Sequence, residues 1–267
     1  MSQSLKRDEL DEILSVAEAA AEAAGRVTLP YFRAGVEIRD KSGAGQDFDP
    51  VTAADVAAEE AIRKVIEAAR PEDAIVGEEF PEKAGESGLT WVLDPIDGTR
   101  AFMMGLPLWG TLIALSDATG PIVGIIDQPY LRERFVGSPL GAWQGKTPLR
   151  ARACADLSEA RLSTTGISWF SEAEQEAFRA VEAKAQLTRF GYDCYAYALV
   201  AHGFIDLVIE AGMQPYDVHA LVPVVQAAGG VITDWRGGPA HASSQIIAAG
   251  DKRLHAQALE LIAPFAN

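Results

Sequence analysis

The chain has few cysteines and few basic residues for its length. Its 267 residues include two cysteines, Cys154 and Cys194, and 23 lysines and arginines against 38 aspartates and glutamates, for a net charge of −15. A chain of this size needs no disulfide framework, and two cysteines fit a reducing compartment. An acidic balance excludes binding to a nucleic-acid backbone, which requires a basic face. We therefore expect no nucleic-acid partner.

Long apolar runs are also missing. No stretch approaches the roughly 18 uninterrupted apolar residues of a membrane span, and residues 1–9 lack the apolar segment of a signal peptide. Apolar residues nevertheless make up 48% of the chain, which suffices for a large core in one domain or two packed ones. These features predict a globular, cytoplasmic protein with no membrane partner.

Two carboxylates follow a short apolar run at residues 91–93. The run has the pattern of a buried strand, and Asp94 comes directly after it. Pro95 has no N–H to donate, so we expect the strand to end there and Asp97 to lie on a turn. From these residues alone, ordinary Asp-Pro turn chemistry is an equally good interpretation.

The next residues predict an anion site beside this pair. Two carboxylates so close together repel each other unless a cation lies between them, and Mg²⁺ prefers oxygen ligands of this kind. Gly98, Thr99 and Arg100 would open a short helix, and free N–H groups at a helix start bind phosphate. Residues 94–100 thus offer metal ligands and a phosphate site together.

Further acids stand where predicted elements begin or end in the first half of the chain. Asp55 follows Thr52 with the T-x-x-D spacing of a capping box, at the start of a helix that runs to about residue 70. Glu78 and Glu79 end a short strand, where neighbouring side chains point to opposite sides. A helix cap explains Asp55, and solvated loop residues explain the glutamates, as well as catalysis does.

The second half contributes two acids in similar positions. Glu210 ends the apolar strand at residues 205–209, and Asp217 begins a helix that stops at Gly229 and Gly230. Asp217 has a structural explanation as a helix N-cap. Pro223 lies inside this helix pattern and predicts a kink.

The order of the predicted elements divides the chain into two parts. The pattern predicts a long amphipathic helix from residue 7 to about 33, which Pro30 kinks or restarts. Residues 41–49 are expected to form a loop or hairpin tip, whose Lys41 either neighbours phosphate or is solvated. Residues 109–143 read as an antiparallel meander, and strands and helices alternate from Arg161 onward. We expect an N-terminal α+β subdomain at 1–153, which carries most metal ligands, and a C-terminal α/β subdomain at 154–267, which completes the site.

Three motifs together resemble the inositol monophosphatase superfamily of Mg²⁺-dependent phosphomonoesterases. They are G-E-E at residues 77–79, D-P-I-D-G-T at residues 94–99, and Tyr216-Asp217 followed by the glycines at 229–230. Their order and spacing match over about residues 10–265. The resemblance implies an α/β (α+β) fold, a layered α-β-α-β-α sandwich, with the site between the subdomains and a homodimeric assembly.

The resemblance also implies the metal ligands. Glu78, Asp94 and the carbonyl of Ile96 would hold one Mg²⁺. Asp94, Asp97 and Asp217 would hold a second, with Asp94 bridging the two, and a third, weaker ion would lie near Glu78.

The remaining roles concern water, phosphate and the leaving alcohol. The resemblance implies that Asp55 and Thr99 activate the attacking water and that the amides of Gly98 and Thr99 bind phosphate. The residues that would meet the alcohol part of a small phosphate ester are Arg100, Asp193 and Glu210. The four histidines (His202, His219, His241 and His255) are scattered, and we interpret them as packing or surface residues.

Within the superfamily the sequence is most similar to histidinol-phosphatases. Inositol monophosphatases usually have tryptophan before the last aspartate and threonine after Gly-Thr, where this chain has Tyr216 and Arg100. Asp193 and Glu210 would attract the cationic histidinol group. We therefore expect hydrolysis of L-histidinol phosphate. Inositol 1-phosphate or a nucleotide 3′-phosphate as substrate, and a non-catalytic Mg²⁺-binding scaffold, are the alternatives.

Overall fold

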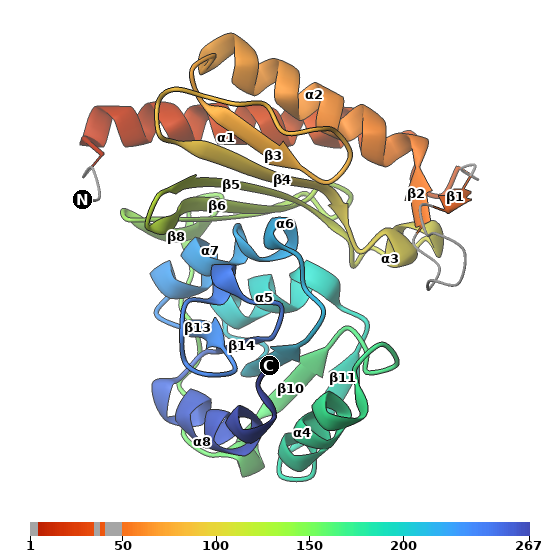
Figure 1. The fold of residues 1–267 in the computed structure, drawn as a ribbon, viewed down its shortest axis with the longest axis vertical. Coiled ribbons are helices and arrows are strands. Elements are labelled where there is room, and N and C mark those ends of the chain that lie inside the picture. Colours follow the sequence, from red (N-terminus) through yellow and green to blue (C-terminus); the bar gives the residue numbers. More distant parts are fainter. Residues whose placement is uncertain (1–4, 35–37, 41–49) are drawn as a thin grey trace.

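The fold consists of five stacked layers. A computed structural model describes residues 5–34, 38–40 and 50–267. Figure 1 shows helices α1 and α2 on one face of the first sheet, a middle layer of helices α5, α6 and α7, then the second sheet, and helices α4 and α8 on the outside. The predicted α-β-α-β-α sandwich is confirmed.

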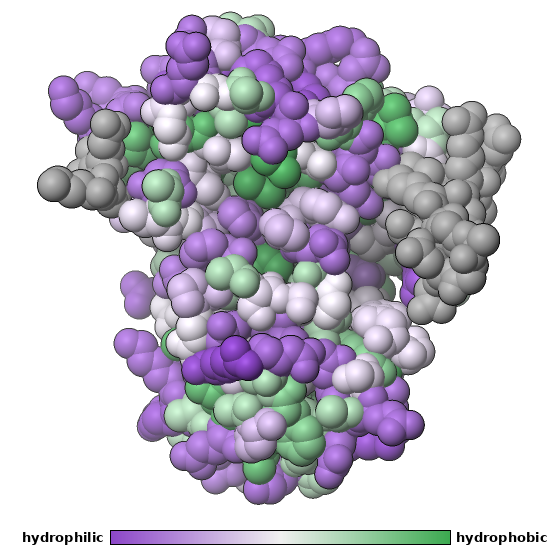
Figure 2. Space-filling view, in the orientation of Figure 1, coloured by the Kyte–Doolittle hydropathy of each residue, from purple (hydrophilic) through white to green (hydrophobic). Residues whose placement is uncertain are grey.

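The outer helices of the N-terminal half pack through apolar faces. Helix α1 (Arg7–Thr28) buries Ile13, Ala17 and Ala20, and α2 (Ala53–Ala69) packs beside it. Helix α1 ends at Thr28, earlier than the predicted residue 33, because Pro30 has no N–H with which to continue the ladder. Hydrophilic side chains predominate on the outer surface over these helices (Figure 2).

The first sheet has seven strands, and the predicted antiparallel meander forms most of it. Strands β3 and β4 are parallel, and each later strand pairs antiparallel with the one before it. The strands are β3 (Ala74–Gly77), β4 (Thr90–Asp97), β5 (Gly110–Asp117), β6 (Gly120–Gln128), β7 (Glu133–Ser138), β8 (Gly141–Gln144) and β9 (Thr147–Pro148).

Strand β4 corrects one prediction. We expected the strand to end at Pro95, but it continues to Asp97 with an irregular register between Asp94 and Asp97. The irregularity accommodates the missing N–H, and the hydroxyl of Thr111 on the neighbouring strand donates to the Pro95 carbonyl at 2.9 Å. Both carboxylates therefore lie on a strand rather than on a turn.

The second sheet mixes parallel and antiparallel strands in the order β11-β10-β12-β14-β13. Its strands are β10 (Arg161–Thr164), β11 (Leu187–Phe190), β12 (Leu207–Glu210), β13 (Val231–Asp234) and β14 (Ile246–Ala249). Its helices are α4 (Glu172–Glu182), α5 (Asp193–His202), α6 (Pro215–Val218), α7 (Leu221–Ala227) and α8 (Lys252–Ile262). The helix predicted after Asp217 is broken into α6 and α7 just before Pro223, as expected of a residue that cannot donate to the preceding turn.

Short elements complete the fold. They are β1 (Ile38–Asp40), β2 (Pro50–Thr52), α3 (Thr99–Met103), and the 3-10 turns η1 (Leu157–Glu159), η2 (Ala240–Ala242) and η3 (Ala263–Phe265). The predicted loop at 41–49, with Lys41, lies outside the described residues. The proposed subdomain boundary at 153/154 falls between β9 and η1. None of the helices in the described ranges is both long and apolar enough to cross a membrane.

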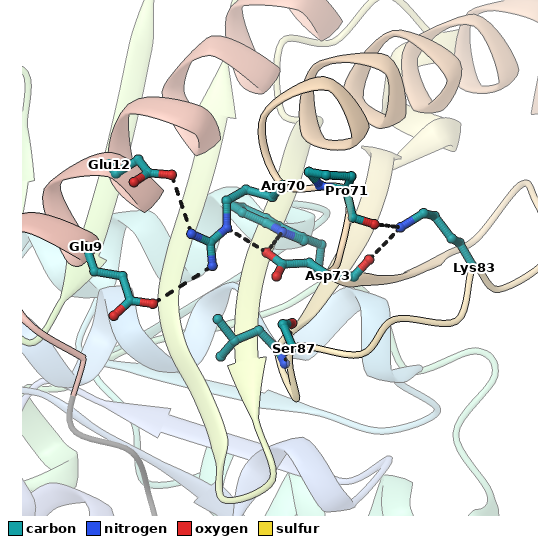
Figure 3. A network of polar contacts seen from close by, with 9 residues as sticks. Glu9, Glu12, Arg70, Pro71, Asp73, Lys83 and Ser87 are labelled. Atoms are coloured by element: carbon teal, nitrogen blue, oxygen red, sulfur yellow. Dashed lines mark hydrogen bonds and ion pairs between the residues drawn. The ribbon is translucent and has the colours of Figure 1, made fainter.

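One polar network ties α1, α2 and the first sheet together (Figure 3). Arg70, at the end of α2, contacts Glu9 and Glu12 of α1 and donates to Asp73 at 3.0 Å. The indole N–H of Trp91 donates to the same Asp73 carboxylate at 2.9 Å. The buried Asp73 charge is therefore matched by a cation and by hydrogen bonds.

Candidate active site

Three aspartates from two distant segments meet at the end of β4. One carboxylate oxygen from each of Asp94, Asp97 and Asp217 lies within 4.8 Å of the others. Asp94 is buried, and its Oδ1 accepts a hydrogen bond from the Ile96 N–H at 3.0 Å. The sequence prediction that these three residues meet therefore agrees with the geometry.

Backbone donors hold the other two aspartates in place. The Gln214 N–H donates to Asp217 Oδ2 at 2.7 Å. The N-cap of the short helix α6 is Gln214 rather than the expected Asp217, which is the third helical residue of a capping box and also belongs to the cluster. The Cys194 N–H donates to Asp97 Oδ2 at 2.6 Å. This contact joins β4 to the start of α5. Sequence reasoning missed Cys194, because a backbone donor leaves no signal in residue type.

Asp55 combines the helix-cap role with a place in the site. Its Oδ2 accepts from the Thr52 N–H at 2.9 Å and from the Thr52 hydroxyl, which completes the predicted capping box. Its Oδ1 lies 3.4 Å from the Thr99 hydroxyl, which also lies 3.1 Å from the Ile96 carbonyl oxygen. The two interpretations of Asp55 are thus compatible.

A fourth acid, Glu78, follows β3 directly. Its negative charge helps to raise the pKa of both Asp94 and Asp217, although its carboxylate is not among the three that lie within 4.8 Å of one another. The next residue, Glu79, is held by its backbone N–H, which donates to Glu59 Oε2 at 2.7 Å. Glu59 is fully buried on α2. Sequence reasoning missed Glu59, although its position on the apolar face of the predicted helix, with Ala58 and Ile62, could have indicated a buried acid.

The acids perturb one another strongly. Burial, followed by the charges of Glu78, Asp97 and Asp217, raises the pKa of Asp94 well above its ordinary value. Burial and the charge of Asp97 raise the pKa of Asp217 to about 8. Burial also raises the pKa of Asp97, against the hydrogen bonds from Cys194. A cation placed among these carboxylates would favour their charged form.

No such cation is supplied by the described residues. Within 5–34, 38–40 and 50–267, no lysine or arginine pairs with Asp94, Asp97 or Asp217. The donor atoms are all oxygens and no histidine belongs to the cluster. Such a set fits a hard divalent cation such as Mg²⁺, which prefers oxygen ligands.

A glycine turn opens next to this cluster. Gly98 precedes α3 and has φ +83°. This left-handed conformation favours glycine, because a residue without a Cβ adopts it without steric cost. A Cβ at Gly98 would lie 3.0 Å from Asp193 Cγ, so Asp193 closes over the turn from α5. Burial, followed by the charges of Asp97 and Glu210, raises the pKa of Asp193 well above its ordinary value, and Arg100 opposes this rise.

The remaining predicted substrate residues line the same region. Glu210, at the end of β12, accepts from the Thr165 N–H at 2.5 Å and from the Thr164 hydroxyl at 3.1 Å. Burial raises the pKa of Glu210 to about 7. Arg100 is exposed, and its guanidinium lies 5.5 Å from the ring centre of the half-exposed Trp169. Trp169 was not predicted, because its position between two loops carries no periodic pattern.

The histidines contact residues outside the cluster. His219 Nδ1 lies 2.9 Å from the Ser116 hydroxyl, His255 Nε2 lies 2.8 Å from the Thr233 hydroxyl, and His202 Nε2 lies 3.1 Å from Gln144. Burial and the neighbouring His241 lower the pKa of His219 to about 4, so its ring is neutral at physiological pH. These contacts agree with the packing roles expected from the sequence.

Comparison with known proteins identifies the family of this arrangement. A model of the inositol monophosphatase family matches residues 9–264. The chain belongs to this family. The protein is therefore a phosphoric monoester hydrolase that acts on small phosphate esters, in a family that is generally metal-dependent.

Relatives and solved structures add detail to the family assignment. The chain is 45% identical over 270 residues to the bifunctional phosphatase IMPL2, chloroplastic, of Arabidopsis thaliana, covering 96% of this chain and 76% of the relative. It is 37% identical to a histidinol-phosphatase of Chlorobaculum parvum, covering 84% and 86%. The structure of an inositol monophosphatase from Zymomonas mobilis superposes with a TM-score of 0.85 at 39% identity, covering 97% and 99%.

Proposed function

We propose that this family member is a Mg²⁺-dependent phosphatase that hydrolyses L-histidinol phosphate to L-histidinol and phosphate. The observation that carries the proposal is the presence of two acidic groups side by side. Asp94, Asp97 and Asp217 lie within 4.8 Å of one another. Asp193 and Glu210 lie close enough to this cluster for Asp97 to raise the pKa of both. The first group suits a metal, and the second suits a cationic alcohol.

In the proposed metal site, Glu78, Asp94 and the Ile96 carbonyl would hold one Mg²⁺, and Asp94, Asp97 and Asp217 would hold a second. A third ion would lie near Glu78. The convergence of Asp94, Asp97 and Asp217, whose carboxylate oxygens lie within 4.8 Å of one another, supports this assignment. Bound Mg²⁺ supplies positive charge that offsets the phosphate dianion and lowers the pKa of water.

The protein's own groups then position water and phosphate. The Thr99 hydroxyl has one proton and two acceptors within reach, the Ile96 carbonyl and Asp55 Oδ1. If the Ile96 carbonyl binds metal, Thr99 donates to Asp55 and accepts from the attacking water. Asp55 then receives the proton through Thr99 as water forms the new P–O bond and the ester P–O bond breaks. The leaving oxygen takes a proton from a second water, so the product departs as the neutral alcohol, and Asp55 returns its proton to solvent. The backbone amides of Gly98 and Thr99, at the start of α3, would donate hydrogen bonds to the phosphate oxygens.

The leaving alcohol would lie between Asp193, Glu210 and the Arg100–Trp169 pair. Histidinol carries an ammonium group and an imidazole. A cationic group beside Asp193 and Glu210 would favour the charged form of these carboxyls, whose pKa is raised by burial, and an aromatic wall also attracts a cation. Two contacts hold Glu210 rigidly at the strand end, so its carboxylate is placed before substrate arrives. These features, together with relatives named histidinol-phosphatase, support histidinol phosphate as the substrate.

Inositol 1-phosphate is the second candidate. One relative is a bifunctional phosphatase and another is a fructose-1,6-bisphosphatase/inositol-1-monophosphatase. A polyol would use Glu210 as a hydrogen-bond acceptor rather than as a counter-ion.

A panel of substrates tests the proposal. Phosphate release would be measured with and without Mg²⁺ on L-histidinol phosphate, inositol 1-phosphate and 3′-phosphoadenosine 5′-phosphate. We expect kcat/KM at least 10²-fold higher for histidinol phosphate, about 2.7 kcal/mol of discrimination. A flat profile would overturn the substrate, activity in EDTA would overturn the metal role, and no release would favour a scaffold. We also propose a homodimer, which sedimentation analysis would test.

A further inference from the structure

Glu59 is a buried acid with no role in the chemistry above. It lies on α2 one turn after Asp55, and its side chain is fully shielded from solvent. A carboxylate in this position is costly unless its charge is paired and its oxygens accept hydrogen bonds. The contacts of both oxygens therefore indicate what Glu59 holds in place.

Each Glu59 oxygen has its own partner. Oε1 accepts from Arg63 Nε at 2.8 Å, and Oε2 accepts from the Glu79 backbone N–H at 2.7 Å. Arg63 continues to the same segment, with a hydrogen bond of 3.3 Å to the Phe80 carbonyl and its guanidinium 5.7 Å from the Phe80 ring centre. One ion pair thus contacts the chain on the C-terminal side of Glu78.

Gly77, the residue before Glu78, packs directly against the Glu59 carboxylate. A Cβ at Gly77 would lie 2.2 Å from Glu59 Oε1, so any side chain there would displace Glu59. The pairing of β3 with β4 ends at Gly77 opposite Leu93. After Gly77 the backbone is no longer paired with β4, and the contacts from α2 to Glu79 and Phe80 hold it instead.

We propose that Glu59, held by Arg63, is the positioning residue that aims Glu78 at the Asp94 cluster. The inference rests on the proposed role of Glu78 as a metal ligand. Helix α2 then places two acids of the site: Asp55 on its first turn directly, and Glu78 through the Glu59 contact with Glu79. Mutating a group that orients a metal ligand typically costs about 10–100-fold in metal affinity or activity, and a group that acts only through Glu78 should affect the affinity.

Glu59→Gln is the test, with Glu60→Gln as its matched control. Glu60 forms the same i,i+4 ion pair on the same helix, with Lys64 at 2.7 Å, but faces solvent. Two quantities would be measured: the Mg²⁺-dependent rise in Tm without substrate, and the Mg²⁺ concentration for half-maximal phosphate release. We expect Glu59→Gln to weaken Mg²⁺ binding about tenfold, or about 1.4 kcal/mol. We expect kcat at saturating Mg²⁺ within threefold of wild type, and no change in Glu60→Gln.

Arg63→Lys is a second, milder variant in case Glu59→Gln does not fold. It keeps the charge beside Glu59 and loses the fork that reaches Phe80, so we expect a smaller weakening of Mg²⁺ binding, about threefold. A lower Tm with unchanged Mg²⁺ affinity in both variants would overturn the positioning role alone. A wild-type protein whose Tm and activity do not respond to Mg²⁺ would overturn the proposed metal site as well, so the two failures are distinguishable.

Discussion

The two ends of α2 treat buried carboxylates in opposite ways. Where α2 ends, Asp73 accepts hydrogen bonds from Arg70 and Trp91, and Arg70 also reaches two glutamates of α1 (Figure 3). Where α2 begins, Asp55 faces Asp94, Asp97 and Asp217, and none of these three aspartates forms an ion pair with a lysine or arginine of the described residues. The same helix and the same strand β4 border both regions.

The difference separates structural acids from functional ones. At the Asp73 end, the protein neutralises its own charge, and the network holds helices to the sheet. At the Asp94 end, burial and mutual repulsion raise several pKa values, and the arrangement is balanced only when a ligand brings positive charge. Acids that serve a binding site thus differ from structural acids in that no lysine or arginine of the described residues pairs with Asp94, Asp97 or Asp217.

The largest effect should come from Asp94→Asn. We expect kcat/KM to fall at least 10³-fold, about 4 kcal/mol of transition-state stabilisation, because the shared metal ligand is lost. Tm without Mg²⁺ should stay the same or rise, since one of several repelling charges is removed. Phosphate release and thermal unfolding on one preparation check both. Activity within tenfold of wild type would reject Asp94 as the bridging ligand.

The opposite result is expected from Asp73→Asn. Removing the charge leaves the mostly buried Arg70 without its nearest partner, which costs about 3 kcal/mol. Tm should fall by about 6–12 °C, while kcat/KM measured well below Tm stays within twofold. Asp11→Asn, which removes an exposed pair with Arg7, is the control and should change stability by less than about 0.5 kcal/mol. A loss of activity without a loss of Tm would break the comparison.

The pH dependence of stability should separate the metal-free from the loaded protein. In the folded chain the pKa is raised from 3.8 to about 8 for Asp217 and from 4.5 to about 7 for Glu210. The folded state therefore holds protons in this window that the unfolded state has lost. Stability from these groups is fully present below about pH 4 and is lost as pH rises to 8. Without metal, Tm should be lower at pH 8 than at pH 6.

Mg²⁺ should oppose that loss. A ligand that binds only the folded state adds about 2.7 kcal/mol at a hundredfold excess over its dissociation constant. We expect the Mg²⁺-induced rise in Tm to be larger at pH 8 than at pH 6, because metal competes with protons for the carboxylates. Equal rises at both values would show that the raised pKa values do not belong to the metal site.

The sequence predicted the parts of the site that local chemistry determines. The T-x-x-D spacing predicted the capping box that Asp55 forms, and Asp94, Asp97 and Asp217 were singled out by their positions at element ends. Their roles in one site, and the α-β-α-β-α layers, were implied by the family resemblance, whereas the meander and the alternating half could be recognised from the pattern. Residues whose function depends on local backbone geometry are visible in the sequence because the motif and the geometry are the same few residues.

Long-range contacts were not predictable in this way. Glu59 contacts a residue 20 positions later, and the Cys194 amide reaches Asp97 across 97 positions. Pro95 was expected to end β4, but the neighbouring strand accommodates it. Each of these depends on which segments the fold brings together. A single sequence carries no pattern for that.

The smallest effect, and the one that refines the comparison within the site, concerns Glu210. It is held by donors from Thr164 and Thr165 and is not among the proposed metal ligands, so Glu210→Gln should keep the fold and the metal ligands. We expect KM for histidinol phosphate to rise about tenfold, about 1.4 kcal/mol, with KM for a small aryl phosphate changed less than twofold. Only the first substrate carries a cationic group for the carboxylate to attract. Equal changes in KM for both substrates would contradict a role of Glu210 in the leaving-group pocket and would indicate that the substitution acts through the metal cluster.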